Sequence, residues 1–356
     1  MYFRDLIVLN LANNNFYGKI PSSMGSLTSI HVLHLSHNRF VGKMPMSLQN
    51  CSELKTIYLG TNSLSGMVPT WIGDNLPNLV ILSLRSNQLY GRLPLNLCHL
   101  SHIQILDLSL NKIEGTIPEC IYNLTAMSLS TNQSVLSAYT KRTTYKDHAS
   151  VVWKGREFVF KNFLGLVKMI DLSSNKLHGE ILEGISSLTE LIALNLSRNN
   201  LTGLIPGKIG LLRNLQSLDL SRNQLCGEIP MSISNISFLS QLDLAINNLS
   251  GKIPTGTQIQ SLDASMFLGN PKLCGSPLPK ECLEDLHPVY MSTRGHKNKN
   301  VQADDDGFIT KGFYVAATLG FIGGFWGVCF ISVLNIQYIM KRLTSNARMT
   351  LALHMA

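Results

Sequence analysis

The stretch IHVLHLSHN at residues 30–38 decides the fold, because its pattern of apolar residues returns along the chain. In this pattern, L-x-x-L-x-L-x-x-N, Leu33 and Leu35 point to one face of a short strand and His34 points to the other. Asn38 closes the unit where the chain turns, since its amide can both donate and accept hydrogen bonds. The pattern occurs at 6–14, 30–38, 54–62, 79–87, 103–111, 167–175, 191–199, 215–223 and 239–247.

The spacing of these units predicts the architecture. With one exception it is nearly constant, since the sequence positions of successive closing asparagines differ by 24, 24, 25, 24, 64, 24, 24 and 24. A unit of this size cannot bury its apolar face alone, so neighbouring units stack and share one core. Their strands then align about 4.8 Å apart in a parallel sheet on the concave side. The sequence therefore predicts an α/β fold of the solenoid type.

Each unit also carries a second motif, L-x-G-x-I-P, as in FVGKMP at 40–45. Its glycine permits a tight bend, and its proline fixes φ and cannot continue a hydrogen-bonded ladder. The unit LHGEIL at 177–182 lacks the proline. This second half resembles the plant-type leucine-rich repeat, and the resemblance implies a second short strand and a twist of the solenoid.

The exceptional interval, between Asn111 and Asn175, shows that an insertion interrupts the repeats. Its place before the last four repeats resembles the island domain of plant leucine-rich-repeat receptors. The string WKGRE at 153–157, followed by aromatic residues, resembles the island of receptor-like proteins of the fungal-elicitor, or ethylene-inducing xylanase, receptor group. We therefore expect repeats 1 to 5 at 1–118, an island insertion at 119–165 and repeats 6 to 9 at 166–262.

The rest of the chain indicates attachment to a membrane. We expect a C-terminal cap and an acidic juxtamembrane stalk at 263–311, a transmembrane helix at 312–334 and a short cytoplasmic tail at 335–356. The span has no formal charge and would be about 35 Å long as a helix, compared with about 30 Å for the hydrocarbon core. Small residues at four-residue spacing favour pairing with another helix, namely Ala316, Gly320 and Gly324, and Gly323 and Gly327.

Glycosylation motifs favour an orientation with the repeats outside the cell. Every N-x-S/T motif precedes the apolar span. The chain is thus expected to be a single-pass plasma-membrane protein with an extracellular N-terminal part and too short a tail for a kinase. The candidate glycosylation sites are Asn50, Asn123, Asn132, Asn195, Asn200, Asn235 and Asn248.

Two pairs of cysteines are candidates for disulfides. Cys98 and Cys120 lie in consecutive repeats, nearly in register, so stacking could bring them within reach, with buried free thiols as the alternative. Cys274 and Cys282 lie in a turn rich in proline and glycine, where a cross-link would hold a small cap. That turn resembles the C-terminal cap of plant leucine-rich-repeat receptors, which implies this second disulfide.

Several functions are not supported by the sequence. The net charge of +8 is spread along the chain without a dense basic run, which argues against nucleic-acid binding. Phosphate-binding loops, nucleophile elbows and metalloprotease motifs are absent from the sequence, so neither an enzyme nor a cofactor is expected. A metal site is not expected from the histidines of the second repeat, which do not converge: His31, His34 and His37. A column of acidic residues is read as the ordinary appearance of the repeat: Asp107, Asp171, Asp219 and Asp243.

The outward positions of the concave sheet are the expected ligand surface. Toward the N-terminal end they carry His34, Lys55, Tyr58 and Arg85. In the resembled family the island helps to hold the ligand and the last repeats meet a co-receptor. This resemblance implies roles for the island residues Trp153, Lys154, Arg156 and Glu157, and for Arg198, Arg222 and Gln241 in the last repeats.

The resemblance covers nearly the whole chain, from Asp5 to Met340. It implies a kinase-lacking cell-surface receptor that binds an extracellular peptide, protein or glycan elicitor. Such a receptor would signal in plant defence through adaptor and co-receptor kinases, which contact its ectodomain and transmembrane helix. The chain begins inside a repeat without a secretory signal or N-terminal cap, so we expect a C-terminal portion. Two alternatives stay open: a truncated, non-sensing modulator that occupies co-receptors, and an inhibitor-type repeat protein that binds a microbial enzyme.

Overall fold

The computed structural model describes residues 5–128, 148–153, 156–161 and 167–282. The chain divides into two units, Met1–Pro288 and Val289–Ala356, and all described residues belong to the first. Among them, no helix has the length and apolar character needed to cross a membrane. The predicted span at 312–334, its small residues and the tail lie outside the described residues.

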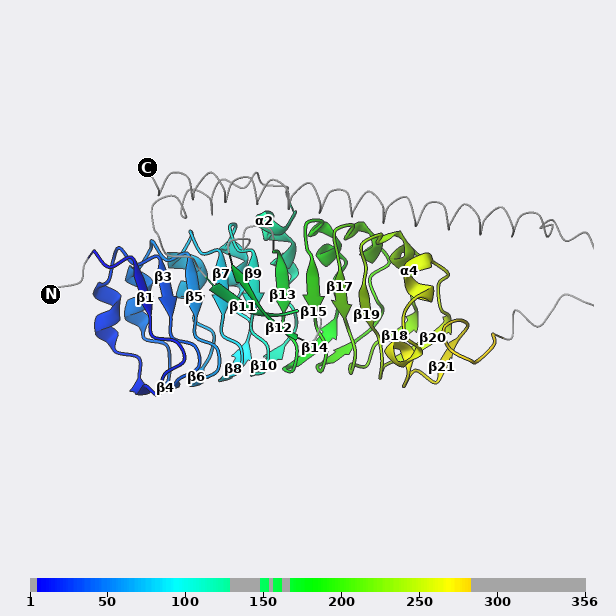
Figure 1. Ribbon diagram of the computed structural model, residues 1–356, viewed down its shortest axis with the longest axis horizontal. Coiled ribbons are helices and arrows are strands. Elements are labelled where there is room, and N and C mark those ends of the chain that lie inside the picture. The colour runs from blue at the N-terminus through cyan, green and yellow to red at the C-terminus, as the bar shows by residue number, and fades with distance from the viewer. Residues whose placement is uncertain (1–4, 129–147, 154–155, 162–166, 283–356) are drawn as a thin grey trace, which may run out of the picture. The chain divides into compact units, whose positions relative to one another are not determined.

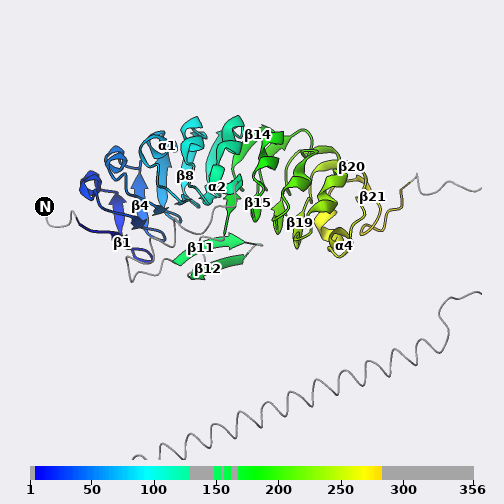
Figure 2. The same ribbon diagram turned by 90° about the horizontal axis from the view of Figure 1, so that it is seen from above.

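A nine-stranded parallel sheet, with one strand from each repeat, runs through the first unit (Figure 1). It lies on the concave side of the curved solenoid (Figure 2). Leu9 pairs with Leu33, and Leu33 pairs with Ile57, so equivalent residues of successive repeats are neighbours. In spatial order the strands are β1 (Val8–Asn10), β3 (Val32–His34), β5 (Thr56–Tyr58), β7 (Ile81–Ser83), β9 (Ile105–Asp107), β13 (Met169–Asp171), β15 (Ala193–Asn195), β17 (Ser217–Asp219) and β19 (Gln241–Asp243).

The insertion does not break this sheet. Strand β9 pairs directly with β13, with Ile105 opposite Met169 and Leu106 opposite Ile170. Part of the insertion forms an antiparallel hairpin of β11 (His148–Trp153) and β12 (Arg156–Lys161). The predicted repeat solenoid is therefore confirmed, and the insertion leaves it without changing the order of its strands.

The second motif of each repeat forms a second set of parallel strands. Its glycines have positive φ: Gly91, for example, has φ 79°. A Cβ added there would lie 2.9 Å from Cγ of Met67 in the preceding repeat, an exposed side chain that can move aside, so the positive φ is what favours glycine here. A seven-stranded sheet contains β2 (Tyr17–Lys19), β4 (Arg39–Gly42), β6 (Ser63–Gly66), β8 (Gln88–Arg92), β10 (Lys112–Gly115), β14 (Lys176–Glu180) and β16 (Asn200–Thr202). A three-stranded sheet contains β18 (Cys226–Glu228), β20 (Asn248–Lys252) and β21 (Lys272–Cys274).

Short 3₁₀ helices return the chain on the convex side. They typically begin after the proline of the second motif: Pro45 is extended, with φ −69°, and η2 starts at the next residue. In the described part of the chain the 3₁₀ helices are η1 (Ser22–Ser26), η2 (Met46–Asn50), η3 (Leu95–His99), η4 (Glu119–Asn123), η6 (Glu183–Ser187), η7 (Ile209–Leu211), η8 (Met231–Asn235) and η9 (Ala264–Phe267). The α-helices among the described residues are single turns: α1 (Trp71–Asn75), α2 (Thr125–Ser128) and α4 (Thr257–Gln260).

A ladder of asparagines joins consecutive coils beside the leucine core. Nδ2 of Asn62 donates to the carbonyl of Leu35 in the preceding coil at 3.0 Å, and its Oδ1 accepts from the backbone N–H of Phe40. The ladder crosses the insertion, because Nδ2 of Asn175 donates to the carbonyl of Leu108 at 3.0 Å. The ladder also extends into the cap. There Nδ2 of Asn270 donates to the carbonyl of Leu244 and its Oδ1 accepts from the backbone N–H of Leu249, although Asn270 lies outside the nine L-x-x-L-x-L-x-x-N motifs.

The insertion begins later than the predicted boundary at 119. Helices η4 and α2 form the convex half of the fifth repeat, and Leu124 and Met127 belong to the core. The backbone N–H of Glu190, in the next coil, donates to the carbonyl of Met127. The apolar residues at 121–127 therefore continue the repeat, and the chain leaves it only after them.

Two disulfides lie in this unit. Cys98 of η3 is bonded to Cys120 of η4, and Cys274 of β21 is bonded to Cys282. The second disulfide lies in the cap, where the fully buried Phe267 and Leu273 cover the end of the core. The other cysteines among the described residues are free: Cys51 is buried and Cys226 is half-buried.

Candidate ligand-binding face

One column of side chains on the concave face has a marked polar character. It contains the residue between the two inward-pointing apolar positions of each strand, and the strand register places these residues next to one another. The column runs Asn10, His34, Tyr58, Ser83, Asp107, Asp171, Asn195, Asp219 and Asp243. Such a surface suits recognition of a ligand by several weak contacts on a rigid support.

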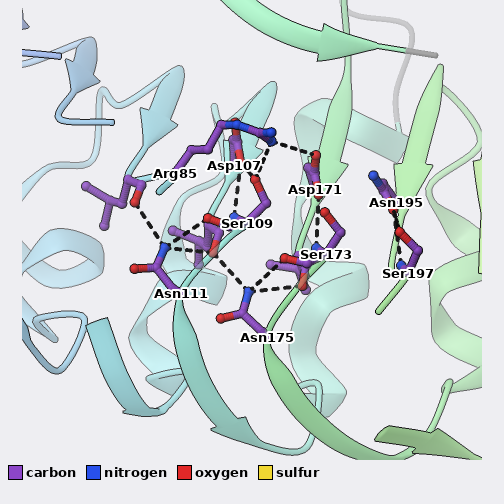
Figure 3. A network of polar contacts seen from close by, with 12 residues as sticks. Arg85, Asp107, Ser109, Asn111, Asp171, Ser173, Asn175, Asn195 and Ser197 are labelled. Atoms are coloured by element: carbon purple, nitrogen blue, oxygen red, sulfur yellow. Dashed lines mark hydrogen bonds and ion pairs between the residues drawn. The ribbon is translucent and has the colours of Figure 1, made fainter. Parts of the chain in front are cut away.

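A partly buried ion-pair network lies where the insertion leaves the solenoid (Figure 3). Nη1 of Arg85 lies 3.5 Å from Oδ2 of Asp171 and donates to Oγ of Ser109 at 2.7 Å. That hydroxyl donates in turn to Oδ1 of Asp107 at 2.6 Å. Side chains from three consecutive coils are thus connected, and the two carboxylates, from β9 and β13, are neighbours in the sheet.

Burial controls the protonation of these two acids. Burial raises the pKa of Asp107, and the charge of Arg85 partly offsets the increase. Two effects raise the pKa of Asp171 to about 7: burial is the larger, and repulsion from the charge of Asp107 is the smaller. Asp171 is 0% exposed, so these carboxylates are internal groups. The sequence pattern places these two acids in the column on the concave face, and the structure adds that both are buried there.

Apolar residues on the outward face of the same strands form a second cluster, separate from the core. Sequence reasoning missed it, although the unbroken apolar run at 79–82 is the pattern of a strand covered on both faces. Both views show the hairpin of β11 and β12 on this concave side (Figures 1 and 2). The cluster contains Tyr58, Val80, Ile81, Ile105, Val167, Met169 and Ala193.

The N-terminal candidates differ in their accessibility. Tyr58 is 3% exposed, and its ring lies 4.8 Å from that of His34 on the neighbouring strand. His34, Lys55 and Arg85 are half-buried. Tyr58 is therefore a packing residue in this structure, and the remaining three are the candidates that can reach a ligand.

The C-terminal end of the face is open and carries charges of both signs. Arg198 and Arg222 are exposed at equivalent turn positions, with φ 55° and 56°. Asp219, Asp243 and Gln241 are half-buried on β17 and β19. Burial raises the pKa of Asp243, and so does the charge of Asp219, whereas the backbone N–H of Ala245 and the two arginines lower it. The structure thus brings Arg198 and Arg222 together with the acidic residues.

The island candidates lie at the tip of the hairpin. Trp153 ends β11, Arg156 begins β12, and these two residues are paired in the antiparallel register. Glu157 is opposite Val152. Lys154 lies outside the described residues. The described residues of WKGRE thus lie at the paired ends of β11 and β12.

The glycosylation motifs lie on different sides of the solenoid. Asn50 and Asn235 end η2 and η8, Asn200 and Asn248 begin β16 and β20, and all four are exposed. Asn195 is half-buried on β15, where its Oδ1 accepts from the backbone N–H of Ser197. Asn123 ends η4, and Asn132 lies outside the described residues. No group of three or more potential metal ligands occurs among the residues that the structure describes.

Comparisons of sequence identify relatives. Family profiles described as leucine rich repeat match residues 5–27, 29–51, 102–133 and 166–225, and they name no catalytic domain. Receptor-like protein EIX2 of Solanum lycopersicum is 56% identical over 205 residues, which cover 58% of this chain and 20% of that protein. Receptor-like protein 50 of Arabidopsis thaliana is 58% identical over 177 residues, which cover 50% of this chain and 18% of that protein. The chain thus spans about a fifth of the length of these relatives.

Solved structures share the fold. The ectodomain of the receptor kinase GASSHO1/SCHENGEN3 from Arabidopsis thaliana, in complex with CASPARIAN STRIP INTEGRITY FACTOR 2, matches with a TM-score of 0.59 and 32% identity over 78% of this chain and 31% of its own. The Arabidopsis receptor kinase HAESA, in complex with the peptide hormone IDA and the co-receptor SERK1, matches with a TM-score of 0.55 and 31% sequence identity. The match covers 77% of this chain and 43% of that chain. A plant ice-binding protein matches with a TM-score of 0.59 and 26% sequence identity, over 78% of this chain and 76% of that chain. Receptor ectodomains and an ice-binding protein share this solenoid, so the function must be argued from the surface.

Proposed function

Because this chain is, by homology, a plant leucine-rich-repeat receptor-like protein, we propose that it binds an extracellular elicitor on its concave face and signals through partner receptor kinases. The elicitor is a peptide, protein or glycan, and the setting is plant defence. The protein is single-pass and lies in the plasma membrane, with its repeats outside the cell.

The open end of the concave face is the observation that carries this proposal. Arg198 and Arg222 stand at equivalent positions of consecutive repeats beside the carboxylates of Asp219 and Asp243. Arginine offers a planar set of donors that matches carboxylates and backbone carbonyls. Donors and acceptors at fixed spacing on a sheet suit an extended ligand whose own polar groups repeat along its length.

The buried middle of the concave face is proposed to keep the sheet rigid, while its open end binds the ligand. The network of Arg85, Asp107 and Asp171 holds coils on both sides of the insertion together. The concave surface can therefore stay rigid where the insertion leaves it. A rigid surface loses little conformational entropy on binding, which favours affinity. The hairpin tip with Trp153 and Arg156 is the second contact proposed for the ligand.

The named complexes of two similar structures support the proposed partners. One contains a receptor ectodomain with a factor bound to it, and the other contains a peptide hormone and a co-receptor. By analogy, we place a co-receptor kinase at the last repeats, near Gln241 and the cap, and adaptor kinases at the transmembrane helix.

A binding experiment with charge-reversed variants tests the proposal. The full chain is displayed on plant cells, and its binding to a purified fungal xylanase of the ethylene-inducing class is measured by surface plasmon resonance on the solubilised protein. We expect Arg198→Glu with Arg222→Glu to weaken binding at least about tenfold, the effect of losing one or two charge-assisted hydrogen bonds. The matched control is Lys112→Glu with Lys176→Glu, two exposed positions on the second sheet.

The outcomes are distinct. Equal weakening by both double variants would show a non-specific effect of net charge and contradict the proposed site. Co-receptor binding without binding of any tested elicitor would favour the modulator alternative. Binding of the xylanase with loss of its catalytic activity would favour the inhibitor alternative.

A further inference from the structure

The seventh repeat departs from the others on the convex side. After Pro206, residue 207 is glycine, and η7 has three residues and begins only at Ile209. In the next repeat, Met231 follows Pro230 directly and η8 has five residues. Gly207 therefore leaves out the side chain that Met231 supplies at the equivalent position.

This omission opens a hollow between η7 and η8. Its volume is about 780 Å³, within the range of about 300–1,000 Å³ of small-molecule sites. The two helices are held close to each other, because a Cβ at Gly210 would collide with the backbone carbonyl of Ser232. The hydroxyl of Ser232 also donates to the carbonyl of Gly207 at 2.7 Å. These contacts fix the spacing of the two helices that border the hollow.

The lining combines the groups that contact sugars. Leu211 is 46% exposed and offers an apolar surface. Lys208 and Arg213 are exposed donors, and neither has an ion-pair partner among the residues that the structure describes. The nearby carboxylate of Glu183 accepts a hydrogen bond from the backbone N–H of Gly207 at 2.9 Å. Cations, hydroxyls and an apolar patch together match a sugar, which has hydroxyl groups at its rim and C–H groups on its faces.

Asn235 also lines the hollow and opens the motif Asn-Ile-Ser. Its side chain is exposed and makes no hydrogen bond to any residue that the structure describes. We propose that the hollow is a carbohydrate subsite that holds the first sugar of an N-linked glycan on Asn235. The inference rests on the proposed extracellular location of the repeats, because glycosylation of this kind belongs to the secretory pathway.

The chain contains a matched control for this site. Asn50 ends η2 in the sequence Pro-Met-Ser-Leu-Gln-Asn, and Asn235 ends η8 in Pro-Met-Ser-Ile-Ser-Asn. Beside Asn50, the preceding repeat has Ser26 and Thr28 where the seventh repeat has Leu211 and Arg213. A glycan on Asn50 therefore has the same attachment geometry without the apolar and cationic neighbours.

Native deglycosylation compares the two sites within one molecule. The full chain is produced behind a leader peptide in cells that add only high-mannose glycans, is solubilised from their membranes in a mild detergent, and is digested with endoglycosidase H. The remaining glycan at each site is followed by mass spectrometry of glycopeptides. We expect trimming at Asn235 to be about tenfold slower than at Asn50 in the native protein, the ratio given by one net hydrogen bond to a charged donor. The rates should be equal after denaturation.

Two variants alter the hollow without changing a core residue. Gly207→Met fills the hollow with the residue of the next repeat; a Cβ at this position meets nothing closer than 3.6 Å. Leu211→Ser with Arg213→Thr copies the surroundings of Asn50. Each is expected to raise the trimming rate at Asn235 to that at Asn50 and leave the rate at Asn50 unchanged.

Four results would overturn the inference. Equal native rates at the two sites, or a slow rate at Asn235 that persists in both variants, would show that the hollow does not hold the sugar. Occupancy at Asn50 without occupancy at Asn235 would overturn it while leaving the proposed function intact. If neither site, nor any other motif, carried a glycan in the solubilised protein, the proposed extracellular location would fail as well.

Discussion

Asp107 and Asp171 are direct partners across the parallel strands β9 and β13, although the whole insertion separates them in the sequence. Elsewhere in the sheet, strand partners from neighbouring repeats are a single repeat apart in the sequence, as Asp219 and Asp243 are. The pairing shows that the chain leaves the solenoid at the insertion and re-enters it at the next coil, with the strand register unchanged. It also places two buried carboxylates side by side, with Arg85 as the cation beside Asp171.

The acid pair makes the stability of the solenoid dependent on pH. Because the pKa of Asp171 is raised to about 7 in the folded chain, this residue takes up a proton on folding between about pH 4 and pH 7. Its contribution to stability is present at low pH and is lost as the pH rises through 7. We expect Asp171→Asn to raise the free energy of unfolding at pH 8 by about 1–2 kcal/mol and to change it little at pH 5.

Urea unfolding followed by circular dichroism at the two pH values checks this prediction. Asparagine fits the site, because Asn195 holds the equivalent position on β15 and accepts the same bond from a backbone N–H. A variant destabilised equally at both pH values would contradict the raised pKa of Asp171, because loss of its charge could then matter at pH 5 only if the group were ionised there.

Removal of the insertion should leave the solenoid folded. Deletion of residues 128–167 joins Met127 to Lys168 and gives Asn111 and Asn175 the same spacing as Asn175 and Asn199. Since β9 already pairs with β13, we expect one cooperative transition in thermal unfolding. We also expect increased binding of a fluorescent apolar dye, because the outward cluster around Ile105 and Met169 would become exposed. Loss of cooperative unfolding would show that the insertion is part of the fold.

The asparagine ladder should be strongest where it crosses between coils. Asn175→Ala removes a donor to the carbonyl of Leu108 and an acceptor for the backbone N–H of Ile113. We expect the free energy of unfolding to fall by about 2–3 kcal/mol, because partly buried backbone groups lose their partners. The matched variant Asn14→Ala should cost less, since among the residues that the structure describes Nδ2 of Asn14 donates within its own coil, to the carbonyls of Leu11 and Ala12. Urea titration of both variants measures the two losses in the free energy of unfolding. Equal losses would contradict the proposed role of the hydrogen bonds between coils.

The cysteines should differ in their reaction with iodoacetamide. Burial raises the pKa of the Cys51 thiol, which lowers its thiolate fraction as well as its access to the reagent. Cys226 is half-buried and should react first in the native protein, whereas Cys51 should react only on unfolding. Cys98 and Cys120 should require a reductant, since they are joined. Peptide mass spectrometry reports each position, and rapid labelling of Cys98 without reductant would contradict the disulfide.

The sequence by itself determined the repeated part of this protein. Leu33 and Leu35 share a face because side chains alternate along a strand, and Asn38 turns the chain because its amide satisfies the backbone. These are local rules that act in every repeat, so a nearly constant period was enough to predict the sheet, its register and the core. Relatives then connected the solenoid with plant receptor-like proteins.

Only the tertiary structure decided what happens where repeats differ or are interrupted. It showed that Asp107 and Asp171 are buried neighbours, that Tyr58 packs and is not exposed, and that Gly207 opens a hollow beside Asn235. Each of these facts depends on which residues of different coils come into contact. Burial is a property of those contacts, and the pattern of a single repeat specifies only the direction in which a side chain points.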